Sequence, residues 1–273
     1  MGTFVEVISA KKDALEIAFK EIDRIEKLLS KYVPDSEISQ LNRYAKLKVS
    51  PETFYVIERA IEFYSLTNGA FDITVGPLMD LWGFTEKIYT IPSERKIRRA
   101  LKLVGCDKII LRNQDNVIQF KLSGMKIDLG AIAKGYAVDC AIKKLKEAGI
   151  KSCLINAGGQ IYCLGKKFSR PWKIAVRDPR NNGVTGYLEL KDKAVATSGN
   201  YEQSFKNKRK SYGHIFDPKT GYPKEPDILS VTVIASDSLT ADALATAIFA
   251  LGKDKGKLLA LKLNGVEVKI IER

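Results

Sequence analysis

Residues 126–139, KIDLGAIAKGYAVD, limit the fold more than any other stretch of the chain. The first four predict a short strand, Gly130 interrupts it, and from Ala131 onward apolar residues recur at helical spacing. The start of a helix offers unpaired backbone N–H groups, and Lys134 adds a cation in the first turns. With Asp128 at the end of the strand, this pattern is typical of a phosphate site. An ordinary strand-to-helix connection with a solvated lysine is the alternative interpretation.

The hydrophobic pattern of the whole chain predicts an α+β fold, with mixed sheets of short strands and packed helices. No internal repeat or Pro/Gly-rich linker divides the sequence, so residues 1–273 are expected to form a single domain. The expected helices cover 12–29, 50–66, 93–104, 131–148, 238–251 and 254–263. The expected strands cover 3–9, 108–112, 116–121, 126–129, 153–156, 160–164, 172–177, 186–190, 194–197, 229–235 and 266–271. Residues 30–39 are typical of a polar turn, and the apolar residues 70–84 fit no regular element.

The composition is that of a globular protein: 45% of the 273 residues are hydrophobic and 28% are charged. No apolar run reaches the roughly 18 residues of a membrane span. The chain begins in a strand-like pattern, without the basic start and apolar core of a signal peptide. Either the native protein begins here or a leader has been removed.

The net charge is +13, from 45 Lys and Arg against 32 Asp and Glu. This excess suits nucleic acid, an anionic membrane or a phosphate-rich ligand, but solvated helix faces explain it better, because lysines interleave with apolar residues. The sequence has no basic-aromatic pattern or zinc-finger spacing, so no nucleic-acid partner is expected. The single histidine excludes a multi-histidine metal centre, and the four cysteines form no CxxC pair. Any metal should be a hard cation held by oxygen, such as Mg²⁺ or Ca²⁺.

Other stretches carry chemistry of their own. Asp242 and Thr246 are four residues apart on a predicted helix, so they share a face and could bind one hard cation. Taken alone, this stretch is explained better by a small-residue helix packed on a sheet, with Asp242 near its start for dipole reasons. His214, close to Asp217, is either a general base or a histidine of a turn. Small residues follow two predicted strands, where backbone N–H groups can approach a ligand, at 156–159 and 196–201.

Eight segments, in this order and spacing, resemble a known family: MGTF at 1–4, KYVPDSEISQLN at 31–42, NGAFDITVGPLMDLWGF at 68–84, KIDLGAIAKGYAVD at 126–139, NAGG at 156–159, ATSGNYE at 196–202, GHIFDPKTGYP at 213–223 and DSLTADALATAIFALG at 237–252. The chain resembles the FAD:protein FMN transferases, the ApbE flavin transferase family once called thiamine-biosynthesis lipoproteins. It departs from the usual family pattern at Gln160 and Asn200, where the family often has aspartate.

The resemblance implies the ApbE fold as a single catalytic unit, with Mg²⁺ as cofactor and FAD as substrate, its pyrophosphate on the metal. The residues implied to contact FAD are Met1, Tyr32, Ala70, Phe71, Asp72, Asp128, Lys134, His214 and Ile215. The implied metal ligands are the main-chain carbonyl of Ala131 and the side chains of Asp242 and Thr246. The implied catalytic residue, acting in proton transfer, is His214.

The implied activity is Mg²⁺-dependent transfer of the FMN moiety of FAD to a threonine hydroxyl of an acceptor flavoprotein, with release of AMP. The acceptor could be a subunit of a membrane redox complex. Water in place of threonine gives an FAD pyrophosphatase. A non-catalytic flavin-binding or electron-transfer protein is an alternative of a different class. The family suggests an extracytoplasmic, membrane-associated location, but the chain has no signal or lipidation motif, so a cytoplasmic location stays open.

Overall fold

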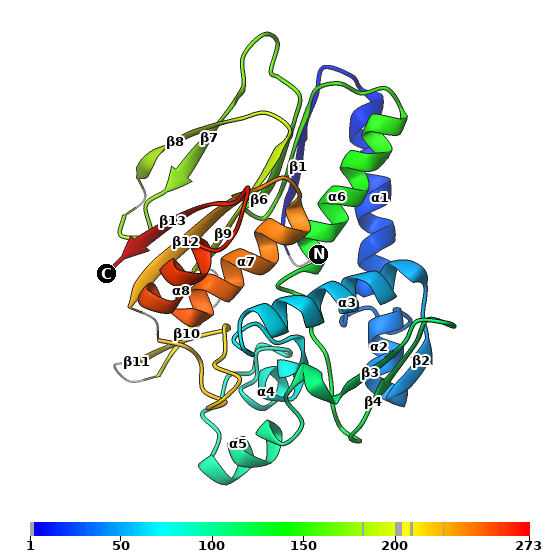
Figure 1. Ribbon diagram of the computed structural model, residues 1–273, viewed down its shortest axis with the longest axis vertical. Coiled ribbons are helices and arrows are strands. Elements are labelled where there is room, and N and C mark those ends of the chain that lie inside the picture. The colour runs from blue at the N-terminus through cyan, green and yellow to red at the C-terminus, as the bar shows by residue number, and fades with distance from the viewer. Residues whose placement is uncertain (1–2, 182, 200–203, 208–209, 226) are drawn as a thin grey trace. The chain divides into compact units, whose positions relative to one another are not determined.

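The computed structural model describes residues 3–181, 183–199, 204–207, 210–225 and 227–273 (Figure 1). Its contacts divide the chain into two compact units. Unit 1 comprises Met1–Glu26, Ile132–Gly199 and Asp227–Arg273, and unit 2 comprises Lys27–Ala131 and Asn200–Pro226. The expected α+β class is confirmed. The expected single domain over 1–273 stays a prediction, because two compact units can serve one catalytic domain.

Unit 1 is built on a six-stranded antiparallel sheet with the strand order β1-β5-β6-β9-β12-β13. The strands are β1 (Val5–Ile8), β5 (Cys153–Ala157), β6 (Gln160–Leu164), β9 (Lys193–Gly199), β12 (Ile228–Ala235) and β13 (Glu267–Glu272). A separate hairpin joins β7 (Trp172–Arg177) and β8 (Val184–Leu190). The helices are α1 (Asp13–Leu29), whose last turn belongs to unit 2, α6 (Ala133–Glu147), α7 (Ser238–Leu251) and α8 (Lys253–Ala260).

The two faces of the sheet are covered differently. Side chains of successive strand residues point to opposite faces. Val195 and Ile234 pack against Trp172 of the β7–β8 hairpin on one face. Their neighbours Ala196 and Val233 point the other way and are buried where α7 packs on β9 and β12 (Figure 1). Helix α7 is almost entirely small and apolar, and most of its residues are buried, as this central position requires.

Unit 2 contains four helices, α2 (Glu37–Tyr44), α3 (Pro51–Leu66), α4 (Gly76–Leu81) and α5 (Glu94–Leu101), among its described residues. An antiparallel sheet has the order β2-β4-β3, with β2 (Lys46–Lys48), β3 (Ile109–Arg112) and β4 (Val117–Phe120). A hairpin joins β10 (Ser204–Asn207) and β11 (Lys210–Gly213), and two short 3₁₀ turns are η1 (Ile73–Val75) and η2 (Cys106–Lys108).

Trp82, directly after α4, is the centre of an aromatic cluster that positions the 212–222 segment. It is fully buried, and its ring centroid lies 5.4 Å from that of Tyr212, 6.1 Å from Phe216 and 5.7 Å from Tyr222. Its indole Nε1 donates a hydrogen bond to the carbonyl of Gly221 at 3.0 Å. The segment that carries His214 is therefore fixed to α4 by ring packing and by one buried hydrogen bond.

The strand expected over 126–129 is wrong. Ile127 N donates to Oδ1 of Asn42 (2.7 Å), and Nδ2 of Asn42 donates to the Ile127 carbonyl (2.9 Å). Asp128 N donates to the carbonyl of Ile73 (2.7 Å). The segment is extended, but a side-chain amide satisfies its backbone groups where a neighbouring strand would otherwise do so.

Three other expectations need correction. Residues 70–84 contain η1, which Asp72 caps, and then α4, with Pro77 in its first turn, where a proline costs no hydrogen bond. The turn expected over 30–39 ends early, because Ser36 caps α2 by accepting a hydrogen bond from Ser39 N. Helix α6 begins at Ala133 rather than at Ala131. The strands β2, β10 and β11 were not expected, and each has only three or four residues.

The glycine pair after β5 belongs to a tight hairpin. Gly158 and Gly159 have φ values of +60° and +91°, as in a two-residue turn with the twist that hairpins favour. Gly159 N donates to Oδ1 of Asn156 at 2.9 Å, and Ala157 pairs with Gln160 across the turn. The positive φ values of this turn are enough to favour glycine at both positions.

Candidate active site

Asp242 of α7 is a buried carboxylate at the meeting point of two helices in unit 1. Only 4% of the residue is exposed. Its Oδ2 accepts a hydrogen bond from the backbone N of Gly135, in the first turn of α6, at 3.0 Å. Nζ of Lys134 lies 3.4 Å from Oδ1. The first-turn N–H group and the lysine that the sequence assigns to a phosphate therefore both contact a protein carboxylate, an anion that the helix dipole favours there.

The close approach of α6 to α7 depends on Gly135. A Cβ atom at this position would lie 2.3 Å from the carbonyl oxygen of Ser238 and 2.8 Å from Cα of Leu239. Both are backbone atoms, which cannot turn aside as a flexible side chain does. Only glycine therefore allows the first turn of α6 to reach Asp242 at this separation.

Asp139, one turn further along α6, holds the start of α7. Its two carboxylate oxygens accept hydrogen bonds from the backbone N of Ser238 (2.7 Å) and of Leu239 (2.8 Å). Burial raises the pKa of Asp139 to about 7 and nearby Asp237 adds to the rise, although the two N–H groups oppose it. Gln160, only 2% exposed, donates from Nε2 to the carbonyl of Ser238 at 2.9 Å. The beginning of α7 is thus held from α6 and from β6.

Thr246 places a hydroxyl group one helical turn after Asp242. Its Oγ1 is 3.2 Å from the Oγ of Ser198 in β9. Carboxylate and hydroxyl oxygens are ligands that a hard cation takes, so this donor set fits Mg²⁺. The third expected ligand, Ala131, belongs to unit 2 and is half-buried in the turn before α6.

In unit 2, Asp128 forms a largely buried ion pair with Lys31. Nζ of Lys31 lies 2.9 Å from Oδ2 of Asp128, and the two side chains are 9% and 14% exposed. The other oxygen, Oδ1, accepts a hydrogen bond from Gly130 N at 2.8 Å. Burial lowers the pKa of Lys31, but the charge of Asp128 and the hydrogen bond to it, with smaller contributions from Tyr32 and Asp80, together raise this pKa above its ordinary value. Lys31 therefore stays protonated and fixes the carboxylate.

Lys31 also links Asp128 to a second carboxylate. Its Nζ donates to Oγ1 of Thr85 (3.0 Å), which donates to Oδ1 of Asp80 (2.6 Å). Lys126 donates to the other oxygen of Asp80 at 2.6 Å. Tyr32 stands beside this network, 62% exposed, with Nζ of Lys31 5.1 Å from its ring centroid. An exposed ring next to a fixed cation is available for stacking on a flat ligand.

The three adjacent residues Ala70, Phe71 and Asp72 differ in their burial and in their contacts. Phe71 is buried and packs edge-on against Phe63, with centroids 5.8 Å apart, and Ala70 is half-buried. Oδ1 of Asp72 accepts hydrogen bonds from the N and Oγ1 of Thr74 at 2.8 and 2.5 Å. Burial raises the pKa of Asp72, although these hydrogen bonds oppose the rise. Asp72 therefore has a structural task as the cap of η1.

Asp72 also lines a cavity of about 330 Å³ in unit 2. The wall includes Tyr64, Asp107, Lys108 and Lys219, so charges of both signs face the space. Burial, followed by the nearby charge of Asp107, raises the pKa of Tyr64 to about 12, so its phenol is neutral at physiological pH. The cavity is thus a polar space, open to a ligand with hydrogen-bonding groups.

His214 follows β11 and is half-buried. The next residue, Ile215, is 7% exposed, and its carbonyl accepts a hydrogen bond from Lys224 N at 2.7 Å. Oδ1 of Asp217 accepts from Lys219 N at 2.9 Å, and its Oδ2 lies 3.5 Å from Nζ of Lys224. Asp217 therefore stabilises its own turn, which begins shortly after His214.

The structure brings some of the predicted residues together. In unit 1, Lys134 contacts Asp242, and Thr246 lies one turn away. Met1 lies outside the described residues. Sequence reasoning missed Lys31, Gly135, Asp139 and Ser198. All four lie inside the segments quoted for the resemblance, but only their contacts across the fold distinguish them from their neighbours.

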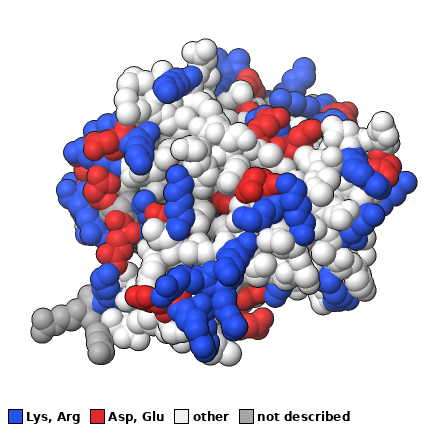
Figure 2. All heavy atoms as spheres, turned by 60° about the horizontal axis from the view of Figure 1, so that its bottom comes forward, with Lys and Arg blue, Asp and Glu red and all other residues white. Residues whose placement is uncertain are grey.

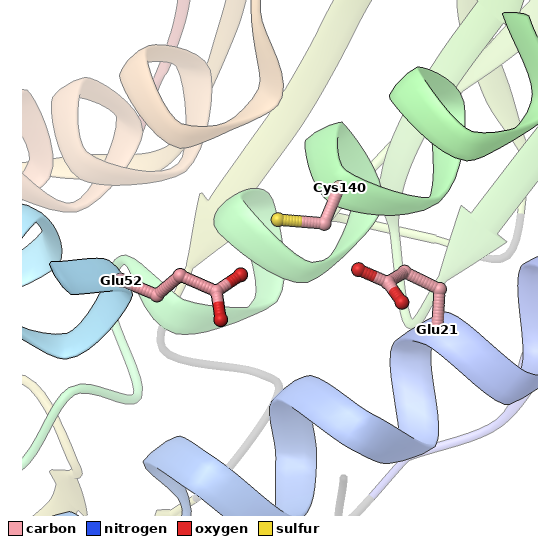
Figure 3. Close-up of side chains that lie close together, drawn as sticks. All are labelled: Glu21, Glu52 and Cys140. Atoms are coloured by element: carbon pink, nitrogen blue, oxygen red, sulfur yellow. The ribbon is translucent and has the colours of Figure 1, made fainter. Parts of the chain in front are cut away.

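A thiol and a carboxylate also meet in unit 1, between α1 and α6. Figure 3 shows the carboxylate of Glu21 and the thiol of Cys140, whose ligand atoms lie within 4.8 Å of each other. Glu52, drawn in the same figure, belongs to unit 2 and is not part of this pair. Arg24 donates two hydrogen bonds to Glu21, at 2.7 and 3.0 Å. The guanidinium neutralises the carboxylate, so this pair needs no bound cation.

Comparison with known proteins shows the family of the chain. Residues 1–270 match the sequence profile of the ApbE family. The FAD:protein FMN transferase of Haemophilus influenzae is 33% identical over 284 residues, covering 100% of this chain and 81% of the relative. That of Vibrio cholerae is 34% identical, covering 92% of this chain and 78% of the relative.

Solved structures show the same likeness. The ApbE protein of Thermotoga maritima aligns with a TM-score of 0.91 and 39% identity, covering 99% of this chain and 91% of that one. The flavin transferase ApbE of Vibrio cholerae aligns with a TM-score of 0.89 and 31% identity, covering 100% and 91%. The fold and the matched sequence define an enzyme of the flavin transferase class. The chain belongs to the ApbE family, and the resemblance read from the sequence is confirmed.

Proposed function

We propose that this protein transfers the FMN moiety of FAD to a threonine hydroxyl of an acceptor flavoprotein and depends on Mg²⁺. Family membership supports flavin transfer. The observation that carries the metal dependence is the buried carboxylate of Asp242, which the fold holds against the first turn of α6 beside a lysine. A buried carboxylate with a cation next to it suits a site where phosphate and metal charges must balance.

The residues we assign to Mg²⁺ are Asp242, Thr246 and the carbonyl of Ala131, all of them oxygen donors. The ion, when bound, offsets charge on the pyrophosphate of FAD. Lys134 balances Asp242 in the structure. Its long side chain, 30% exposed, can also reach toward a phosphate, because a lysine is a point charge on a flexible stem.

The residues we assign to FAD binding are Met1, Tyr32, Ala70, Phe71, Asp72, Asp128, Lys134, His214 and Ile215. Their chemistry suits the parts of this ligand. Tyr32 offers an exposed ring for stacking, and Asp128, fixed by Lys31, offers carboxylate oxygens to a hydroxyl or amide group. Asp72 is committed to capping η1, so we expect it to shape the wall rather than to bind through Oδ1.

His214 is the residue we assign to proton transfer. The threonine oxygen forms a bond to the FMN-side phosphorus, the bond from that phosphorus to the AMP oxygen breaks, and His214 accepts the hydroxyl proton. A hydroxyl is a poor nucleophile until its proton is drawn off. His214 is half-buried in a turn that the aromatic cluster around Trp82 holds in place, so it can be oriented for this step.

The group that accepts the FMN moiety decides which reaction takes place. With water in place of threonine, the same residues give an FAD pyrophosphatase, and a protein that only carries flavin would release no AMP. The structure has no helix long and apolar enough to span a bilayer among its described residues. An extracytoplasmic, membrane-associated location stays a prediction from the family resemblance.

The test is incubation with FAD, Mg²⁺ and an acceptor flavoprotein, with AMP and a flavin-labelled band as products. Asp242→Asn keeps the shape of the side chain but removes its charge, so we expect loss of transfer and of Mg²⁺ binding measured by calorimetry. The matched control, Asp254→Asn, removes an exposed carboxylate of α8 and should behave as the parent. Unchanged Mg²⁺ affinity in Asp242→Asn would remove it from the metal site.

A further inference from the structure

A strongly basic surface in unit 2 is not explained by flavin transfer. We define it as residues 87–102, from the loop after α4 through α5. It contains six cations and one acid, Glu94, and so contributes +5 to the net charge of +13. The cations are all exposed: Lys87, Arg95, Lys96, Arg98, Arg99 and Lys102. Figure 2, which brings this end of the molecule forward, shows Lys and Arg side chains gathered in its lower centre.

The fold fixes the direction in which these charges point. Ile97 is 2% exposed and packs with Leu78, Met79 and Trp82, so α5 uses its one apolar side for the core. The cations on the rest of the helix must then face water. Arg98 is paired with Glu94 at 3.1 Å, but a single acid cannot neutralise the group. An uncompensated cluster of this kind attracts anions.

Exposed apolar side chains lie directly beside the charges. Ile88 is 76% exposed and Ile91 is 43% exposed, both in the loop that leads into α5. Between them, the Tyr89 ring stacks on Phe205 with centroids 4.8 Å apart and an interplanar angle of 10°. That stack anchors the loop to β10, so the two isoleucines are presented from a fixed position rather than from a free coil.

We propose that residues 87–102 bind the surface of an anionic phospholipid membrane. Lys and Arg attract acidic headgroups, and neighbouring aliphatic side chains enter the interface between headgroups and acyl chains. Nucleic acid fits less well, because the Tyr89 ring, the aromatic ring within the surface, is already stacked on Phe205. The proposal rests on charge and exposure alone and does not require the transferase activity.

The test is co-sedimentation with lipid vesicles. We expect the parent protein to bind vesicles of phosphatidylcholine containing about one third phosphatidylglycerol and to bind pure phosphatidylcholine weakly. It should dissociate from the anionic vesicles as added salt screens the charges. Each Lys or Arg at an anionic surface changes partitioning about fivefold, so Arg95→Gln, Lys96→Gln and Arg99→Gln together should weaken binding on the order of 100-fold. These residues are exposed, so the variant should fold, as circular dichroism can verify.

A matched control removes three positive charges elsewhere. Lys11, Lys12 and Lys20 are exposed residues of unit 1, and their change to Gln should leave binding close to that of the parent. Ile88→Ser tests the apolar contribution and should weaken binding while leaving its salt dependence unchanged. Failure of the parent to bind anionic vesicles would overturn the proposal, and so would an equal loss in both triple variants, because net charge rather than this surface would then govern binding.

Discussion

Replacing Gly135 by alanine tests the geometry at the centre of the candidate site. Propensity alone predicts that Gly135→Ala stabilises α6, since glycine inside a helix costs about 1 kcal/mol relative to alanine. The structure predicts the opposite sign. The added Cβ would lie 2.3 Å from the carbonyl oxygen of Ser238, where ordinary van der Waals contacts begin near 3.4 Å. The two helices would have to separate by about 1 Å.

That separation has a second cost. The hydrogen bond from Gly135 N to Oδ2 of Asp242 is 3.0 Å long, and an added 1 Å takes it beyond hydrogen-bond range. Overpacking costs about 1–3 kcal/mol, and the loss of a hydrogen bond to a charged group about 1.5–3 kcal/mol. After subtracting the gain in propensity, we expect a net loss of roughly 1.5–5 kcal/mol in the free energy of unfolding.

Urea unfolding measures this loss, and calorimetry with Mg²⁺ shows whether Asp242 has moved. Gly149→Ala is the control. Gly149 follows the C-terminal end of α6 and has a φ of +72°, and a Cβ atom added there would lie within 4 Å of no described atom beyond its chain neighbours. It should cost stability through backbone strain but leave Mg²⁺ affinity unchanged. A Gly135→Ala variant as stable as the parent would refute the close approach of α6 to α7.

Three further outcomes are expected. Lys31→Met leaves the charge of Asp128 without its partner and should lower the free energy of unfolding by about 2–4 kcal/mol. The double variant Lys31→Met/Asp128→Asn should regain much of this loss, and an equal loss in the double variant would contradict the prediction. The folded-state pKa of Asp139 is raised from 3.8 to about 7, so the free energy of unfolding of the parent should fall by at most about 4 kcal/mol as pH rises from 3.8 to about 7, and then level off. Urea unfolding at several pH values should show that Asp139→Asn lacks this pH dependence. His214→Asn should keep FAD bound but slow flavin transfer ~10²–10⁴-fold, and transfer at the parental rate would exclude His214 as the base.

The long helices of this fold could be predicted from the sequence because their signals are local. Helix α3 begins at Pro51 after a serine cap, and α1 shows apolar residues on one side over its whole length. The extended segment around Ile127 could not be separated from a strand, because its apolar pattern is the same. Only the fold reveals that its partner is the side chain of Asn42.

The candidate site shows the same limit. Helical spacing predicts that Asp242 and Thr246 share one face, and the structure places both on α7. The role of Lys134 as the partner of Asp242 depends on how α6 meets α7, which no local pattern contains. Lys31 likewise became visible only through Asp128, a residue far away in the sequence. Long-range electrostatic pairs are therefore the part of a site that single-sequence reasoning finds last.

In unit 1, helices α6 and α7 are joined by two carboxylates, one from each helix. Asp242 of α7 accepts a hydrogen bond from the first turn of α6, and Asp139 of α6 accepts two from the first turn of α7. Each helix start thus receives carboxyl oxygens of the other helix as acceptors for its unpaired backbone N–H groups. At Asp242 this bond uses Oδ2, while Lys134 contacts Oδ1. Because the two contacts use different oxygens, Lys134 can leave Oδ1 while Oδ2 keeps the helices joined, so a change of partner at Lys134 does not require α6 and α7 to separate.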